Sequence, residues 1–168
     1  GFVDKTGKME IPCQFDDANS FNEGIAAVKI RGKWGFIDKN GEFITPCQFE
    51  DQDPRSSTPY CFSEGLCAVR INDKFGFINK TGKVVIPGWF DRAEDFRNGL
   101  ARVSCNEKEG YIDNTGKLII PCEFDSGNDF YEGLASVFKD GKWRVVDKTG
   151  KVVIPYQLDS PVSFVEGM

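Results

Sequence analysis

The sequence predicts an all-β protein built from tandem repeats, and three observations lead to this fold class. One phrase recurs five times along the 168 residues, with a period near 34 residues. Apolar and polar residues alternate through parts of each copy, as they do in half-buried β-strands. Glycine and proline recur so often that no window is long enough for a helix. We therefore expect small sheets and no helices.

The copies are separated by 34, 41, 34 and 34 residues, and they begin at Gly1, Gly35, Gly76, Gly110 and Arg144. The predicted units of this single repeat domain (1–168) are residues 1–34, 35–75, 76–109, 110–143 and a truncated 144–168. One recurrent position fixes the register with Phe21, Phe62, Phe96, Phe130 and Phe164. Residues that return once per unit are expected to build the unit rather than to form one active site.

Each unit is expected to supply three strands of an antiparallel meander. In the first full set these are IAAVKI (25–30), WGFID (34–38) and EFITP (42–46). The bridge DKNG has the composition of a short hairpin turn, and a proline ends the third strand. The remaining segment, CQFDDANSFNEG (13–24), is interpreted as a connection with one short extended piece and with its two Phe rings turned into the core.

The ends of the chain bear on how the units are stacked. The chain begins with the second strand of a unit, so it holds four first strands but five of each of the other two. A ring closed by joining its ends would lack one strand, and a four-stranded propeller blade usually takes about 40 to 45 residues. We therefore expect an open superhelical or solenoid-like array, with a five-bladed propeller-like ring as the alternative, and we expect the true N-terminus to lie upstream.

The most complete copy of the phrase is GKWGFIDKNG at 32–41. Later copies change its aromatic-glycine pair to Phe75-Gly76, Glu109-Gly110 and Trp143-Arg144. These phrases resemble the WG-repeat family, also called KWG repeats, over essentially the whole chain. The resemblance implies a repeat scaffold of the kind found in bacterial proteins, without a defined reaction. We expect the pair positions, Trp34, Gly35, Phe75, Gly76 and Trp143, to serve the core or inter-unit packing; a ligand-binding stripe is the alternative.

Composition argues against two classes of partner. The net charge is -5 and the pI is near 4.9, whereas a nucleic-acid binder needs a basic face that releases counterions. No apolar stretch approaches the ~20 residues that span a bilayer, so no membrane contact is expected. Lysines cluster around the hairpin turns, and acids dominate the long connections and the Glu-Gly entries. If the sheets stack regularly, one rim is expected to be basic and the other acidic.

The six cysteines are interpreted as free thiols. Cys13, Cys47 and Cys122 share one repeat position, and Cys67 and Cys105 occupy strand positions as small apolar residues. We expect the remaining one, Cys61, to be the most exposed. There is no CxxC motif and no histidine, so neither a metal site nor a cofactor is expected. Free thiols favour a reducing compartment and hence a cytoplasmic location.

No catalytic residue is predicted. The lack of histidine removes the commonest general base and both the Ser-His and Cys-His nucleophile pairs. Acid pairs such as Asp16 with Glu23, or Glu50 with Glu64, leave a carboxylate-based glycoside hydrolase as a remote alternative. An acid recurs at one position as Asp16, Glu50, Asp91, Asp125 and Asp159, and we interpret it as a source of turn hydrogen bonds.

Departures from the repeat are where a one-off function is expected. Trp89 replaces a residue that is polar in the other copies (Gln14, Gln48, Glu123 and Gln157), so it should be exposed. With Arg55 and Tyr60, in and beside the insertion at 52–58, it forms the speculative binding set. The insertion itself is either a tolerated loop or a binding loop.

The sequence thus predicts a non-enzymatic scaffold that binds another protein through an extended surface, as repeat arrays do. A carbohydrate-binding module that uses Trp89 or the recurrent aromatics is the alternative. End strands of an open array can also pair with another copy, so self-association is a further expectation.

Overall fold

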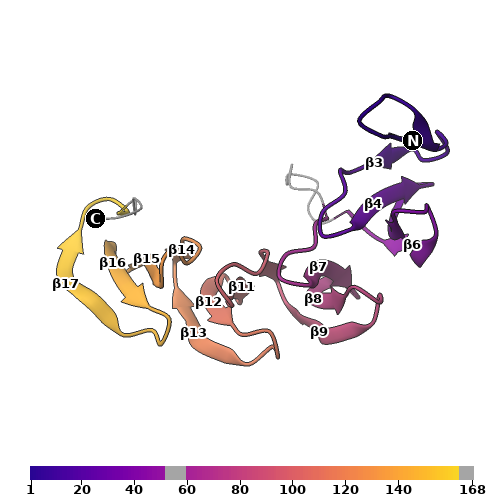
Figure 1. The fold of residues 1–168 in the computed structure, drawn as a ribbon. Coiled ribbons are helices and arrows are strands. Elements are labelled where there is room, and N and C mark those ends of the chain that lie inside the picture. Colours follow the sequence, from indigo (N-terminus) through magenta and orange to yellow (C-terminus); the bar gives the residue numbers. More distant parts are fainter. Residues whose placement is uncertain (52–59, 163–168) are drawn as a thin grey trace. The chain divides into compact units, whose positions relative to one another are not determined.

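The computed structural model describes residues 1–51 and 60–162, which contain strands, turns and no helix. The strands form five small sheets in chain order (Figure 1). The sheets are β1 (Phe2–Val3) and β2 (Met9–Ile11); β3 (Asp17–Ala18), β4 (Ile25–Ile30), β5 (Lys33–Asp38) and β6 (Phe43–Phe49); β7 (Leu66–Ile71), β8 (Lys74–Asn79) and β9 (Val84–Phe90); β10 (Arg92–Ala93), β11 (Ala101–Cys105), β12 (Lys108–Ile112) and β13 (Leu118–Phe124); and β14 (Ser126–Gly127), β15 (Leu134–Lys139), β16 (Lys142–Asp147) and β17 (Val152–Leu158).

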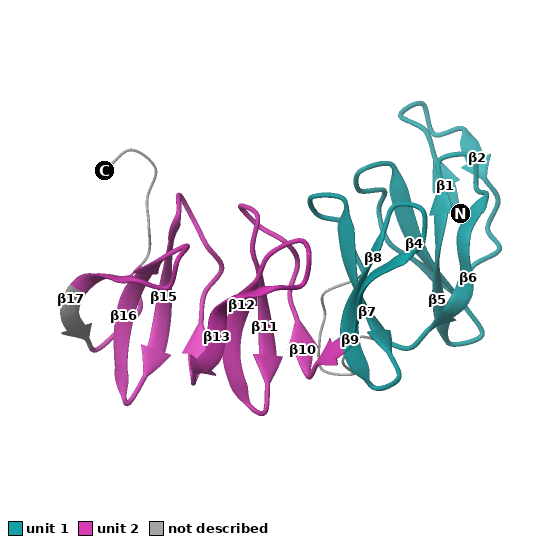
Figure 2. Cartoon of the chain, turned by 90° about the horizontal axis from the view of Figure 1, so that it is seen from below, with its two compact units in different colours: residues 1–88 teal, residues 89–168 magenta. Residues whose placement is uncertain are grey.

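The predicted fold class is confirmed: the chain is all-β, its small antiparallel meander sheets follow one another in tandem, and no sheet of the described residues closes into a barrel. The short extended piece expected in the connection is present as β3, β10 and β14, each of which adds a two-residue strand to the first strand of its sheet. Residues 1–88 and 89–168 form two compact units, unit 1 and unit 2 (Figure 2).

Two kinds of turn connect the strands. At 22–25, Asn22 and Ile25 exchange both backbone hydrogen bonds, at 2.9 and 3.0 Å, around Glu23 and Gly24 with φ of 49° and 88°. Both central residues are left-handed, as in the type I′ turn that matches the twist of a hairpin. Sequence reasoning did not identify this hairpin, because glutamate rarely adopts a positive φ.

The DKNG bridge forms the predicted hairpin turn between β5 and β6. One carboxylate oxygen of Asp38 accepts hydrogen bonds from the backbone N–H of Asn40 and of Glu42, both at 2.9 Å. Gly41 has the expected positive φ, 82°. The hydrogen bond from Glu42, with the weaker ones beside it, lowers the pKa of Asp38, so the carboxylate that shapes the turn stays ionised at neutral pH.

The glycine of the aromatic-glycine pair lies under a bulge in the third strand. Trp34 pairs with Phe49 and Phe36 pairs with Thr45, so three residues of β6 face the single residue Gly35. The bulge folds onto that glycine: a Cβ there would lie 2.8 Å from the backbone N of Cys47 and 2.8 Å from the carbonyl carbon of Pro46. The same register shift faces Gly110, so close backbone approach explains why the aromatic is followed by glycine.

The fifth copy departs from this rule without losing the bulge. Trp143 pairs with Leu158 and Val145 pairs with Ile154, with Arg144 between them in the place of the glycine. The Arg144 guanidinium lies 3.6 Å from a carboxylate oxygen of Asp140. A side chain is therefore accommodated at this position in one copy.

Each unit has its own aromatic core. In unit 1, Phe36 makes edge-to-face contacts with Phe49, Tyr60 and Phe62, with ring centroids 5.3–5.9 Å apart. In unit 2, Tyr111 and Phe130 meet edge to face at 4.9 Å. The recurrent Phe position serves these cores as predicted, since it is buried at Phe62, Phe96 and Phe130 and half-buried at Phe21; Phe164 lies outside the described residues.

Neighbouring copies also meet through the glycine of the hairpin turn. Gly41 lies against Ile11 and Gly150 lies against Ile120, where added Cβ atoms would be 3.4 and 3.3 Å from the isoleucine side chains. Gly82 meets Thr45 at the same position. In these three pairs, each within one unit, the third strand supports the turn of the next copy.

Thr45 is a weak point of this contact, because its buried hydroxyl has no hydrogen-bond partner among the described residues. We expect Thr45→Val, which keeps the shape and removes the orphaned hydroxyl, to stabilise the protein by about 1 kcal/mol. Denaturant titration of both proteins measures this difference. Thr45→Ser keeps the hydroxyl and loses the methyl group against Gly82, so it should be less stable than the parent; a Thr45→Val protein that is also less stable would contradict the assignment.

Candidate interaction surface

Each third strand exposes an apolar side chain at its first residue. These five residues are between 44% and 55% exposed, and we call them the outer row: Met9, Phe43, Val84, Leu118 and Val152. Sequence reasoning did not single them out, although they share one repeat position that is apolar in every copy. Packing in the core of its own copy does not explain why an apolar residue recurs at a position that stays exposed.

The backbone explains this exposure. Side chains two residues apart along a strand point to the same side of the sheet. The residue two places after each outer-row position is buried at Ile11, Thr45, Ile86 and Ile120. Outer-row side chains therefore lie at the end of the packed interior, beside the hairpin turn. Phe43, for example, contacts the ring of Phe15 edge to face at 6.4 Å and leaves about half of its surface in water.

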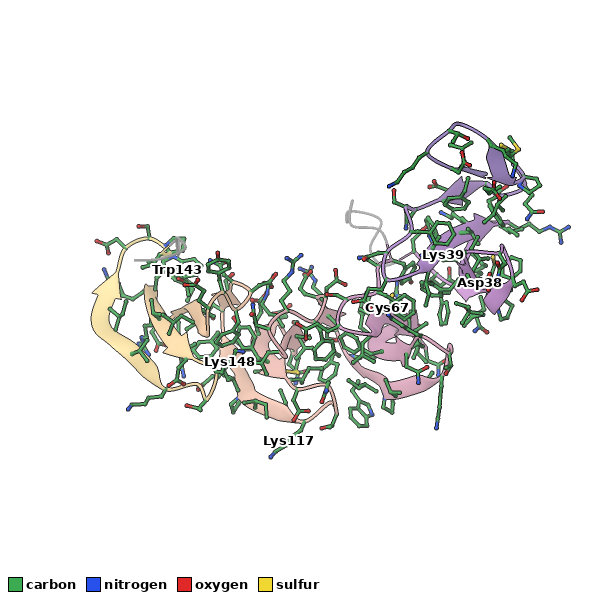
Figure 3. All side chains as sticks on the ribbon, in the orientation of Figure 1. Asp38, Lys39, Cys67, Lys117, Trp143 and Lys148 are labelled. Atoms are coloured by element: carbon green, nitrogen blue, oxygen red, sulfur yellow. A yellow bond between two sulfur atoms is a disulfide. The ribbon has the colours of Figure 1, made fainter. Side chains whose placement is uncertain are left out.

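A lysine precedes the outer-row residue in four copies, as Lys8, Lys83, Lys117 and Lys151. Lys117 extends away from the sheet at the turn between β12 and β13 (Figure 3). Within residues 1–51 and 60–162, the ammonium groups of Lys83, Lys117 and Lys151 form no ion pair. The apolar ends of these strands are thus accompanied by lysines that make no direct ion pair, although Lys117 and Lys151 lie near enough to Asp113 and Asp147 to lower the pKa of those carboxyls slightly.

The expectation of one basic and one acidic rim is wrong. Since β4 and β5 are antiparallel, the Glu-Gly turn before β4 and the lysine-containing turn after β5 lie at the same end of the sheet. The Lys80 ammonium lies 3.0 Å from the carboxylate of Glu23. At the opposite end, lysines at the start of second strands pair with the recurrent acids: Lys33 with Glu50, Lys108 with Asp125, and Lys142 with Asp159.

The recurrent acid has the structural role predicted for it. Asp16 accepts a hydrogen bond from the backbone N–H of Arg31 at 2.6 Å, and Asp91 accepts one from Asn106 at 2.7 Å. Both donors are left-handed residues of the turn between the first and second strands. In unit 2 the side chain of Lys108 donates to Asp125 and lowers the pKa of that carboxyl.

The Glu-Gly turn also fastens one copy to the next. One carboxylate oxygen of Glu23 accepts the backbone N–H of Gly65, in the equivalent turn of the next sheet, at 3.0 Å, and it also faces Lys80. In unit 2 the equivalent residue is Asn98. Its side-chain amide donates to the Phe130 carbonyl at 2.9 Å, and its backbone carbonyl accepts from the ammonium of Lys148, which Figure 3 labels. These contacts offset the cost of placing Glu23 and Asn98 in the left-handed region.

The contacts of Glu23 with Gly65 and Lys80, which we call the Glu23 clasp, should make stability depend on pH. The hydrogen bond from Lys80 is the largest effect on the pKa of Glu23 in the folded protein; with the hydrogen bond from Gly65 it lowers this pKa, against the smaller opposing effect of burial. A lowered pKa stabilises above the unfolded value near 4.5 and is lost as pH falls through the folded value. We expect Glu23→Gln to cost about 0.5–1 kcal/mol at pH 7, because the pair is partly exposed, and nothing at pH 2. Thermal unfolding at both pH values measures this; an equal loss at pH 2 would contradict an electrostatic clasp.

Comparison with protein families identifies the repeat. The model of the WG containing repeat matches residues 1–34, 34–75, 75–108, 110–143 and 144–168. The chain belongs to the WG-repeat family. These matches reproduce the five copies to within one or two residues. A comparison with curated proteins gives no match.

The structure describes two of the three residues of the speculative binding set in these WG repeats, Trp89 and Tyr60. Trp89, on β9, is 59% exposed, as predicted, and it contacts the ring of Phe90 at 6.4 Å. Arg55 lies outside the described residues, as does the insertion at 52–58. Tyr60 does not present its ring to solvent: it is 3% exposed, packs on Trp34 at 6.0 Å and donates its hydroxyl to the Glu50 carbonyl. Of the two described residues of this set, Trp89 is exposed and Tyr60 is buried.

The aromatic of the WG pair belongs mainly to the core. Trp34 and Phe75 are buried, as predicted, and the indole N–H of Trp34 donates to the Asp51 carboxylate at 2.6 Å. Trp143 is half-buried and contacts the ring of Phe138 at 5.3 Å. A continuous stripe of exposed pair aromatics is therefore not present in these copies.

The acid pair Asp16 and Glu23 does not have the geometry of a glycosidase. Asp16 is bonded to Arg31, directly after β4, whereas Glu23 lies just before β4. A strand of six residues spans roughly 17 Å or more, and paired glycosidase carboxyls lie about 5–9.5 Å apart. Of the second pair, Glu50 is bound to Lys33. Both pairs are better explained by the turns that they hold.

The cysteines differ from the all-thiol interpretation in unit 2. Cys105, at the end of β11, forms a disulfide with Cys122 in the bulge of β13. The expectation of Cys105 as a free apolar residue is therefore wrong, and the argument for a reducing compartment does not extend to this pair. The missed signal was that both repeat positions hold cysteine in only one sheet. Among the free cysteines, Cys13 rather than Cys61 is exposed; Cys61 is half-buried beside the Asn22 amide, 2.7 Å away, and Cys67 is buried as predicted.

Two further observations concern other chemistry. In residues 1–51 and 60–162, no three side chains of the metal-ligating types lie close enough together to hold an ion. The described residues also contain no helix that is long and apolar enough to cross a membrane.

Proposed function

We propose that this chain is a non-enzymatic WG-repeat scaffold that binds another protein through the outer row. The observation that carries the proposal is the recurrence of an exposed apolar side chain at the first residue of every third strand. Scattered exposed apolar residues are normal, but one at the same position in each copy marks a surface that extends along the copies of each unit. Repeat arrays use such extended surfaces for binding.

Contacts between copies support a continuous surface within each unit. Gly150 lies on Ile120, so the turn that leads into Val152 lies beside the strand that begins with Leu118. Gly41 lies on Ile11 in the same way, which brings Phe43 beside the strand that begins with Met9. A partner can therefore contact outer-row residues of adjacent copies at once.

The test is photo-crosslinking from single positions. A benzophenone side chain is placed at Phe43 or Leu118, and at Gln48 as a matched control, since Gln48 is exposed on the same strand as Phe43 but outside the row. The proposal expects the same protein adducts from positions 43 and 118, none from position 48, and loss of the adduct at 43 when Met9→Ser is added. Equal labelling from all three positions, or none, would overturn it.

Carbohydrate binding is the second candidate, favoured by the exposed ring of Trp89. Exposed indole faces stack on sugar rings, whereas the outer row has no planar aromatic face in unit 2. A glycan array separates the two functions. Signal that disappears in Trp89→Ala would favour the carbohydrate module, and protein docking through the outer row predicts silence on the array.

Self-association is a form of protein binding that belongs to the same proposal. Third strands lie at the edge of their sheets, and strand edges can pair with another chain. Size exclusion with light scattering would show a concentration-dependent dimer if the partner is a second copy. A strict monomer would leave a different protein as the partner.

A further inference from the structure

The disulfide between Cys105 and Cys122 joins strands that are not neighbours. β11 and β13 flank β12, and the bulge of β13 that carries Cys122 lies against Gly110 of β12. The two Cα atoms lie 5.9 Å apart, within the normal range for a disulfide. The missing side chain of Gly110 lets the backbone of this bulge, and with it Cys122, lie close to β12.

In unit 1 a cysteine of the third strand also reaches the first strand, but no disulfide joins the two strands. There Cys47 has the place of Cys122 and Ile30 has the place of Cys105. The Cys47 thiol lies over Gly35 and 3.7 Å from the Val28 carbonyl on the far strand. Burial raises the pKa of this thiol, so it remains protonated and able to donate. The chain therefore already contains a bond-free version of the arrangement, with the same bulge register.

Both bonded cysteines are also accessible. Cys105 and Cys122 are half-buried, and Cys105 is followed by the exposed turn residues Asn106 and Glu107. The buried Cys67, in contrast, has no exposed surface. A small thiol can therefore reach the disulfide while the sheet stays folded, which is the condition for exchange in the native state.

We propose that Cys105 and Cys122 form a reversible redox clip that sets the stability of unit 2 without changing its fold. A thiolate of a dithiol attacks one sulfur and forms a mixed disulfide, and its second thiol closes the reagent to a cyclic disulfide. Two electrons and two protons pass from the dithiol to the two cysteines. The reduced sheet keeps the arrangement of Ile30 and Cys47. Exchange with a small disulfide, which takes up the two electrons and two protons and leaves as two thiols, restores the bond between β11 and β13.

The experiment uses the whole chain in native buffer. Dithiothreitol is added, thiols are alkylated and mapped by mass spectrometry, and circular dichroism and thermal unfolding are recorded in parallel. The expected result is that Cys105 and Cys122 become alkylated only after reduction, that the strand signal persists, and that the melting temperature of unit 2 falls by about 10 °C, since the bond closes a loop of 17 residues.

Two variants keep the test specific. Cys105→Ser should have the lower melting temperature from the start and no response to dithiothreitol. Ile30→Cys should form an equivalent bond with Cys47 and give unit 1 the same response. The proposal is overturned if both thiols are alkylated before any reductant is added, if the bond is reduced only after denaturation, or if its reduction abolishes the strand signal.

Discussion

Replacing Gly35 by alanine is expected to lower the free energy of unfolding by about 3 kcal/mol. The added methyl group would lie 2.8–2.9 Å from three backbone atoms of Pro46 and Cys47. Backbone atoms cannot rotate away as a flexible side chain can, so the bulge of β6 must lift from β5. That movement would disturb the aromatic contacts of Phe36 and Phe49 beneath it.

Gly65→Ala is the matched control for this variant, and denaturant titration measures both. Gly65 has a φ of 81°, and an added Cβ would meet no atom within 4 Å, so it carries only the backbone cost of a left-handed alanine, about 1 kcal/mol. A loss at Gly35 no larger than the loss at Gly65 would contradict the close-approach explanation. Arg144 shows that a side chain can occupy this position in the fifth copy, which keeps the same bulge register.

Most of the fold follows from residues that act locally. Asp38 and Gly41 specify their hairpin turn through hydrogen bonds and backbone conformation within five residues, so the sequence was sufficient to predict it. The strand pattern around Trp34 and Phe36 likewise reports burial on one sheet. Five copies of each signal made the all-β tandem array predictable.

Features that depend on two distant residues were not predictable in this way. The left-handed Glu23 makes sense only once its carboxylate is seen on Gly65, 42 residues later. The bond from Cys105 to Cys122 needs the bulge of β13. The expectation that a proline ends each third strand is wrong, because Pro121 lies in this bulge and β13 continues to Phe124. Exposure of the outer row was also hidden, because an apolar residue that recurs is first expected to be buried.

One copy has an ion pair at two positions where the other copies have a small residue and an aromatic residue. Three copies combine a small residue on the first strand with the aromatic of the WG pair: Ala27 with Trp34, Ala68 with Phe75, and Ser136 with Trp143. The remaining copy has Arg102 and Glu109 at these positions. The strand register places the two residues of each pair on the same face of the first and second strands, at diagonal positions.

The geometry of this replacement is tight. A terminal nitrogen of Arg102 lies 3.1 and 3.0 Å from the two carboxylate oxygens of Glu109. Glu94 and Asp129 lie 3.7 and 3.6 Å from other nitrogens of the same guanidinium. Arg102 and Glu109 have side chains only 22% and 21% exposed, so both charges depend on each other.

Removing either partner alone should therefore be costly, and removing both should not. We expect Arg102→Ala to lose about 3 kcal/mol, because the partly buried Glu109 carboxylate loses its cation and Glu94 loses its own, while Asp129 keeps Arg97. Glu109→Trp should lose about 2 kcal/mol, since an indole would crowd the guanidinium and displace its closest partner. The double variant recreates the pair of Ala27 and Trp34, and we expect it to unfold within about 1 kcal/mol of the parent. Denaturant titration of the four proteins gives the coupling energy, expected to be near 4 kcal/mol in favour of matched pairs. Losses that simply add in the double variant would show that the two positions are independent, and that the replacement in this copy is not a compensated exchange.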